Sequence, residues 1–129
     1  TLDGGREMWT PEKWQAFVPR LQHWMTMWEV MAARHGVRAD AGYLLGTPEP
    51  GVADIVTSTL WTTMADRFGQ IGELLERTAP VTAALSRRLQ QVPALKALSA
   101  RAWVDYGDAY CGGQIEASMR RVIGAAPVH

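Results

Sequence analysis

Few side chains in this sequence have the types and spacings that chemistry requires. His23 and His35 are twelve residues apart, His129 ends the chain, and Cys111 is its single cysteine. Metal sites and nucleophilic centres are recognised by short, characteristic spacings among such residues, and the sequence contains none of these spacings. We therefore expect no metal and assign no catalytic residue to this chain.

Cys111 has two readings. Asp108 and Tyr110 lie near it in the sequence, which could suggest a reactive thiol, but no cation lies within three residues to stabilise a thiolate. A packed or surface thiol is the simpler interpretation. Because the chain has one cysteine, an internal disulfide cannot form.

Asp54 is the acid whose position is most informative. The run from Gly51 to Asp54 ends a loop rich in glycine and proline and opens an apolar segment, Ile55 to Met64. An acid three residues after the N-cap lies at N3, where its carboxylate can accept from the N-cap N–H and complement the positive helix end. We expect Gly51 and Asp54 to form a structural cap, and we do not interpret Asp54 as a catalytic acid.

The rest of the pattern is helical. Thr10, Pro11 and Glu12 supply a hydroxyl N-cap, a proline at N1 and an acid in the first turn, and Gly36 ends that helix. Val92 is biased away from helical geometry by the proline after it, which predicts a break. The predicted helices cover residues 10–35, 52–67, 70–77, 80–91, 93–106 and 114–122. Since no alternating strand pattern appears, we predict an all-α bundle of about five to six helices.

The first predicted helix carries a wide apolar stripe. Large apolar residues recur at three- and four-residue steps between residues 14 and 31. Met27 and Val30 widen this stripe beyond one core contact, so we expect a second dry neighbour. Two interpretations are open for the side chains of Trp24, Met27, Trp28 and Met31. They are core residues, or they line an apolar pocket, which flexible methionine and flat tryptophan suit.

The sequence resembles the C-terminal helical domain of glutathione transferases, over nearly its whole length. The resemblance is carried by Tyr43-Leu44-Leu45-Gly46 running into Val52-Ala53-Asp54, by Ala79-Pro80-Val81 through Arg87-Arg88-Leu89, and by Val92-Pro93-Ala94-Leu95. Family members usually have Ser or Thr where this chain has Gly51. Glycine at an N-cap costs only a few tenths of a kcal/mol relative to serine, so the departure is tolerable.

The resemblance implies that two domains carry out different parts of the function. An N-terminal thioredoxin-like domain, absent from this sequence, would bind most of the co-substrate glutathione and activate its thiol. This helical domain would form the pocket for a small apolar electrophile and part of a homodimer interface, as in a detoxification enzyme. Trp24, Met27, Trp28 and Met31 would line that pocket, with Tyr106 and Tyr110 as further candidates. Alone, the chain is expected to be inactive.

Composition indicates a compact protein and argues against some classes of partner. The chain has 129 residues, a formal net charge of zero and 47% hydrophobic residues, which describes one compact domain without general attraction to nucleic acid. No apolar run reaches the roughly 20 residues of a membrane span, so we expect no membrane partner and a cytoplasmic location. We divide the chain into a linker from the upstream domain (1–9), the helical domain (10–124) and a tail (125–129).

A second function remains open from the sequence. The same helical domain resembles ones that are appended to translation factors and synthetases, where it acts as a non-enzymatic protein-interaction module. Fold alone does not separate that function from catalysis.

Overall fold

The computed structural model describes residues 9–109 and 113–124. Over this part the chain is all-α, with six α-helices and two short 3₁₀ helices and no strand, as predicted. The elements are α1 (Pro11–Arg34), η1 (Leu44–Gly46), α2 (Val52–Arg67), α3 (Gly69–Thr78), α4 (Pro80–Gln90), α5 (Pro93–Tyr106), η2 (Gly107–Ala109) and α6 (Gln114–Ile123).

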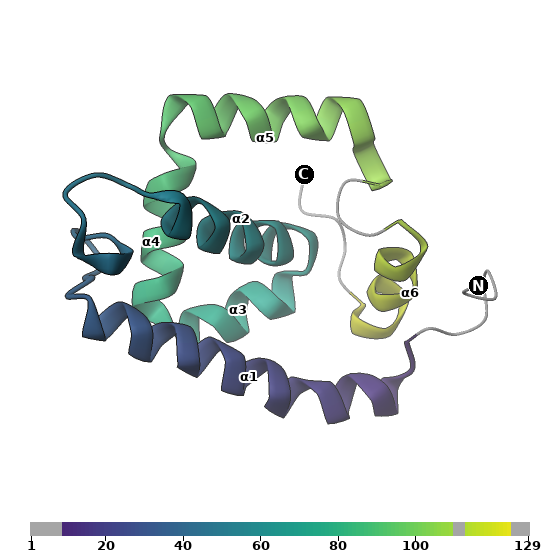
Figure 1. Cartoon of the computed structure of the whole chain (residues 1–129). Helices are drawn as coiled ribbons and strands as arrows, with labels where there is room; N and C mark the ends of the chain where they lie inside the picture. The colour runs from purple at the N-terminus through teal and green to yellow at the C-terminus, as the bar shows by residue number, and fades with distance from the viewer. Residues whose placement is uncertain (1–8, 110–112, 125–129) are drawn as a thin grey trace.

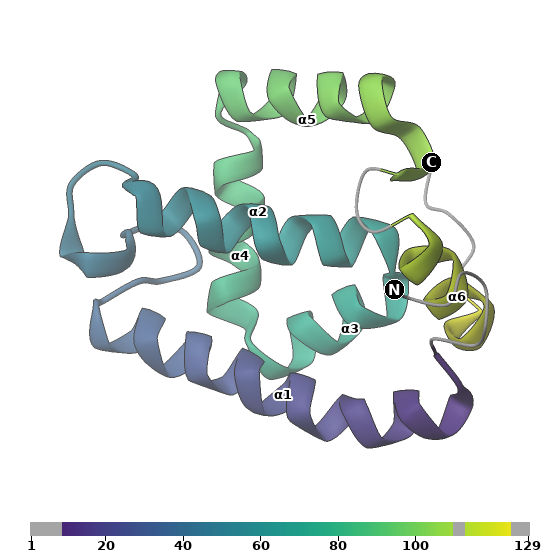
Figure 2. The same cartoon turned by 45° about the vertical axis from the view of Figure 1, so that its right-hand side comes forward.

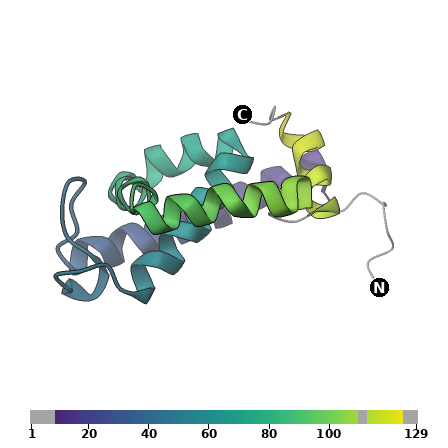
Figure 3. The same ribbon diagram turned by 90° about the horizontal axis from the view of Figure 1, so that it is seen from above.

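The helices form three levels. α2, α3 and α4 pack against one another in the middle of the molecule, and α1 covers one side of them by packing against α3 and α4. α5 runs along the opposite side, so that α1 and α5 are at opposite edges of the bundle in both Figure 1 and Figure 2. Viewed from above, α4 is seen end-on beside α5 (Figure 3). α6 packs against the N-terminal part of α1.

The core consists of two clusters of buried side chains that Trp28 joins. The larger cluster contains Met25, Trp61 and Ile71, which are almost completely buried, and the smaller one contains Leu85 and Leu89. Trp28 is half-buried and packs against both clusters. The inner side of α1 therefore holds the two halves of the core together.

The helix boundaries follow local chemistry. The Thr10 hydroxyl accepts a hydrogen bond from the backbone N–H of Lys13 and caps α1, while Pro11 occupies its first position. Val92 has the extended backbone that its following proline favours, and this separates α4 from α5. The ends of all six α-helices agree with the predicted ranges to within one residue.

α5 is attached to the bundle at few points. None of its residues is buried. It packs against α4, the Ser99 hydroxyl donates to the Gln90 side chain at 3.2 Å, and the Trp103 ring lies 4.4 Å from the Arg67 guanidinium carbon. Leu98 and Val104 are largely exposed. The helix thus has apolar side chains on its outer side that no other described residue covers.

Candidate functional site

Asp54 fixes the loop that precedes α2. Its side chain is completely buried, and one carboxylate oxygen accepts from the Gly51 N–H at 2.8 Å, the hydrogen bond predicted from its N3 position. The other oxygen accepts from the backbone N–H of Leu44 at 2.7 Å, across ten residues. Both oxygens are occupied by backbone donors. Asp54 therefore holds the loop against the helix start, and it has no free oxygen for proton transfer.

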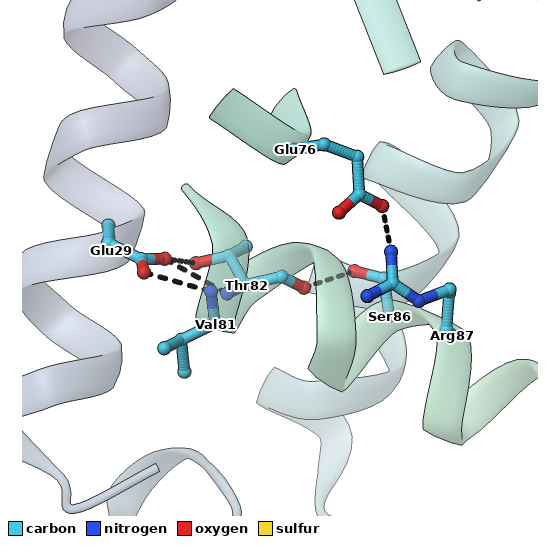
Figure 4. A network of polar contacts seen from close by, with 6 residues as sticks. All are labelled: Glu29, Glu76, Val81, Thr82, Ser86 and Arg87. Atoms are coloured by element: carbon cyan, nitrogen blue, oxygen red, sulfur yellow. Dashed lines mark hydrogen bonds and ion pairs between the residues drawn. The ribbon is translucent and has the colours of Figure 1, made fainter. Parts of the chain in front are cut away.

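Glu29 has a similar role between α1 and α4. The N-cap of α4, Ala79, has no side-chain acceptor, so the first N–H groups of that helix need one from elsewhere. The Glu29 carboxylate supplies it by accepting from the backbone N–H groups of Val81 and Thr82 and from the Thr82 hydroxyl, each at 2.9 Å (Figure 4). The only acid on the second half of α1 is thus committed to structure.

The outer side of α1 presents a face of large apolar side chains. Trp24 is 52% exposed, Met27 57%, Val30 47% and Met31 38%. These residues lie at helical spacing beside the buried stripe of α1, and we call them the α1 face. The sequence predicted a second dry neighbour for this helix. Within the described part of the chain this side of α1 is open, and Trp28 marks the boundary between the α1 face and the core.

One of the predicted pocket residues does not join the α1 face. Tyr106 is 65% exposed at the end of α5, on the opposite side of the bundle from α1 (Figures 1 and 2). Tyr110 lies outside the described residues, as do Cys111 and His129. The candidate site is therefore one helix face formed by Trp24, Met27 and Met31, with Trp28 at its edge.

No group of three or more His, Cys, Asp or Glu residues in the described part of the chain could hold a metal ion. His23 is exposed and His35 is half-buried, and the structure does not bring them together with an acid. The α1 face likewise offers no polar side chains that suit the charged ends of glutathione. Any glutathione contact would have to come from other residues.

Glu12 and Asp66 have displaced pKa values, and both lie away from the α1 face. Hydrogen bonds from its own backbone N–H and from the Thr10 hydroxyl lower the pKa of Glu12 at the start of α1. Partial burial raises the pKa of Asp66, near the end of α2. The α1 face thus carries no acid or base of its own, and it can act only by binding and by excluding water.

A buried ionic cluster, which no sequence pattern indicated, ties α6 to the bundle. Arg67 of α2 and Arg120 of α6 both pair with the buried carboxylate of Glu116. Arg67 also contacts the Trp103 ring of α5. Since these residues are far apart in the sequence, no local spacing signals the cluster. It positions α6 and the end of α5 relative to α2.

The described chain is thus a small all-α domain with a buried N3 aspartate in α2, a capped start of α4 and an exposed apolar face on α1. The sequence matches the family described as "Glutathione S-transferase, C-terminal domain" over residues 1–122. The chain belongs to this family. A comparison with curated proteins finds no match.

Membership in this family bears on the domain that accompanies the helical domain. Helical domains of this family typically have an N-terminal thioredoxin-like domain as their partner.

No helix in the described part of this chain is long and apolar enough to cross a membrane.

Proposed function

We propose that this chain is the helical domain of a glutathione transferase, and that its α1 face forms the apolar wall of the electrophile site and part of a homodimer surface. The observation that carries the proposal is the exposure of Trp24, Met27 and Met31 side by side on α1. Large apolar side chains that gather on one open face usually mark a binding surface.

The chemistry of the α1 face suits an electrophile wall. Methionine adapts its shape and tryptophan offers a flat apolar surface, so together they accept apolar molecules of varied form. In the proposed reaction the thiolate sulfur of glutathione attacks an electrophilic carbon, a carbon–sulfur bond forms and the leaving group departs with its electron pair. The α1 face contributes position and a dry environment, and thiol activation belongs to the thioredoxin-like partner domain.

The same helix can also form part of a dimer interface. The α1 face extends over Val30 as well as the aromatic and methionine side chains, which is wider than one small ligand needs. A second copy of the protein that packs along part of α1 would cover the remainder. A cytoplasmic setting, where glutathione is abundant, fits this proposal.

The kinetics of the full-length product of the gene that encodes this chain test the proposal. Trp24→Ser and Met27→Ser should raise the KM for an apolar aryl halide by roughly three- to tenfold, because each removes part of the apolar contact. The KM for glutathione should stay unchanged. Val104→Ser is the matched control, because Val104 is 80% exposed on α5, away from the α1 face. Equal kinetics for all three variants and the wild type would overturn the electrophile wall.

The isolated chain provides a second test of the proposal. It should show no conjugation above the uncatalysed background, because it has no group on the α1 face that could activate a thiol. If the full-length protein also lacks turnover but captures a protein partner through α1, the chain acts as an interaction module of the same fold.

A further inference from the structure

A cavity of about 390 Å³ lies between α2, α3, α4 and the start of α5, and no residue of α1 lines it. Its size is near the lower end of the range typical for small-molecule sites, about 300–1,000 Å³. The cavity is thus separate from the α1 face and from the function proposed for that face.

The inner part of the cavity is apolar. Trp61 of α2, Leu75 of α3 and Ala83 of α4 contribute to its lining and are themselves buried. The Trp61 indole supplies a large flat surface, and its N–H has no hydrogen-bond partner in the described part of the chain. This inner region suits an apolar group of a ligand.

The outer part of the cavity is charged, with both signs present. Glu76 and Arg87 pair with each other across α3 and α4 (Figure 4), so their charges are already compensated. Asp66 on α2 and Lys96 on α5 also line the cavity, and neither forms an ion pair within the described residues. Two different helices that border the cavity therefore each carry one charge that no described residue pairs with, negative on α2 and positive on α5.

We propose that this cavity binds a small zwitterion of dipeptide size with an apolar side chain. Its ammonium group would pair with Asp66, its carboxylate with Lys96, and its side chain would lie against Trp61. Asp66 and Lys96 line the same cavity without pairing with each other, so a molecule with one charge of each sign on a short body would pair with both.

Other ligand classes fit less well. An inorganic anion would meet Lys96 but also the carboxylate of Asp66, and Arg87 is already neutralised by Glu76. A purely apolar molecule would desolvate Asp66 further without a compensating cation, and burial already raises the pKa of that carboxyl. A bound ammonium group would lower this pKa again.

The dipeptide alanyl-phenylalanine is the probe for this site. In the ¹⁵N-labelled chain it should shift the Trp61 indole N–H signal in a saturable way, and Asp66→Asn and Lys96→Gln should each weaken binding by about tenfold. The N-acetylated dipeptide, which lacks the ammonium group, should bind about tenfold more weakly and should be indifferent to Asp66→Asn. The dipeptide amide, which lacks the carboxylate, should be indifferent to Lys96→Gln.

Two variants with the same charge changes serve as controls. Glu73→Gln on α3 and Arg101→Gln on α5 remove exposed charges that do not line the cavity, so they should leave the affinity unchanged. Circular dichroism first establishes that each variant is folded. The proposal is overturned if millimolar dipeptide leaves the Trp61 signal unmoved, or if binding is equally strong in Asp66→Asn, Lys96→Gln and both controls.

Discussion

Two buried or half-buried carboxylates, Asp54 and Glu29, each accept hydrogen bonds from two backbone N–H groups. Asp54 joins the loop at Leu44 to the start of α2, and Glu29 joins α1 to the start of α4. Removing such a partner leaves buried donors unsatisfied, which costs more than the hydrogen bond itself contributes. These two side chains are therefore the points where single substitutions should affect stability most clearly.

Asp54→Ala should lower the free energy of unfolding by about 2 to 4 kcal/mol, because two backbone donors lose their acceptor at once. Gly51→Ser is the companion variant. Its new Cβ would lie 3.7 Å from the Asp54 carboxylate, an ordinary contact, so stability should be equal or slightly higher. Denaturant midpoints measure both. An Asp54→Ala midpoint equal to that of the wild type would show that the cap does not support the loop.

Glu29→Gln keeps the size of the side chain but removes its charge and one acceptor. It should destabilise the chain by about 1 to 3 kcal/mol, because the start of α4 loses an anion that complements its N–H groups. The same change at Glu73, which is exposed on α3, is the control and should be neutral within about 0.5 kcal/mol. Comparable losses in the two variants would argue against a specific role for Glu29.

At the scale of elements, the sequence determines the helices well because their ends carry strong local chemistry. Thr10 with Pro11, Gly51 with Asp54, and Val92 before Pro93 mark three starts, and each coincides with the observed helix. The 3₁₀ turn at Leu44–Gly46 was not predicted. It places Leu45 at a φ of +64°, a conformation that leucine rarely adopts, so the leucine type gives no signal for it.

The weak attachment of α5 to the bundle has a consequence for the local dynamics of this helix. Because no residue of α5 is buried, little packing opposes its local opening. Amides of α5 should exchange with deuterium distinctly faster than those of α2 and α4, as followed by mass spectrometry of the intact chain. Protection of α5 equal to that of α2 would contradict this account and would imply that its apolar outer face is covered in solution.

At the scale of the whole molecule, helical periodicity finds which residues share a face but not what that face meets. The stripe on α1 predicted a second dry neighbour, and the structure shows that part of the stripe is exposed in the described chain. Periodicity could not show that Tyr106 lies on the other side of the bundle, because that depends on the direction in which the chain leaves Val92. The charges at Asp66 and Lys96 were missed for the same reason, since only the fold brings α2 and α5 to one cavity.

The most direct test of the electrophile wall uses the methionine methyl groups of the full-length protein as reporters. Met27 and Met31 lie on the α1 face, whereas Met25 and Met119 are buried in the core and serve as internal controls. With ¹³C-methyl labelling, S-hexylglutathione should shift the Met27 and Met31 signals, and glutathione without the hexyl chain should leave them in place. If the hexyl conjugate saturates the protein and the Met27 and Met31 signals do not shift, the assignment of the α1 face to the electrophile site is contradicted.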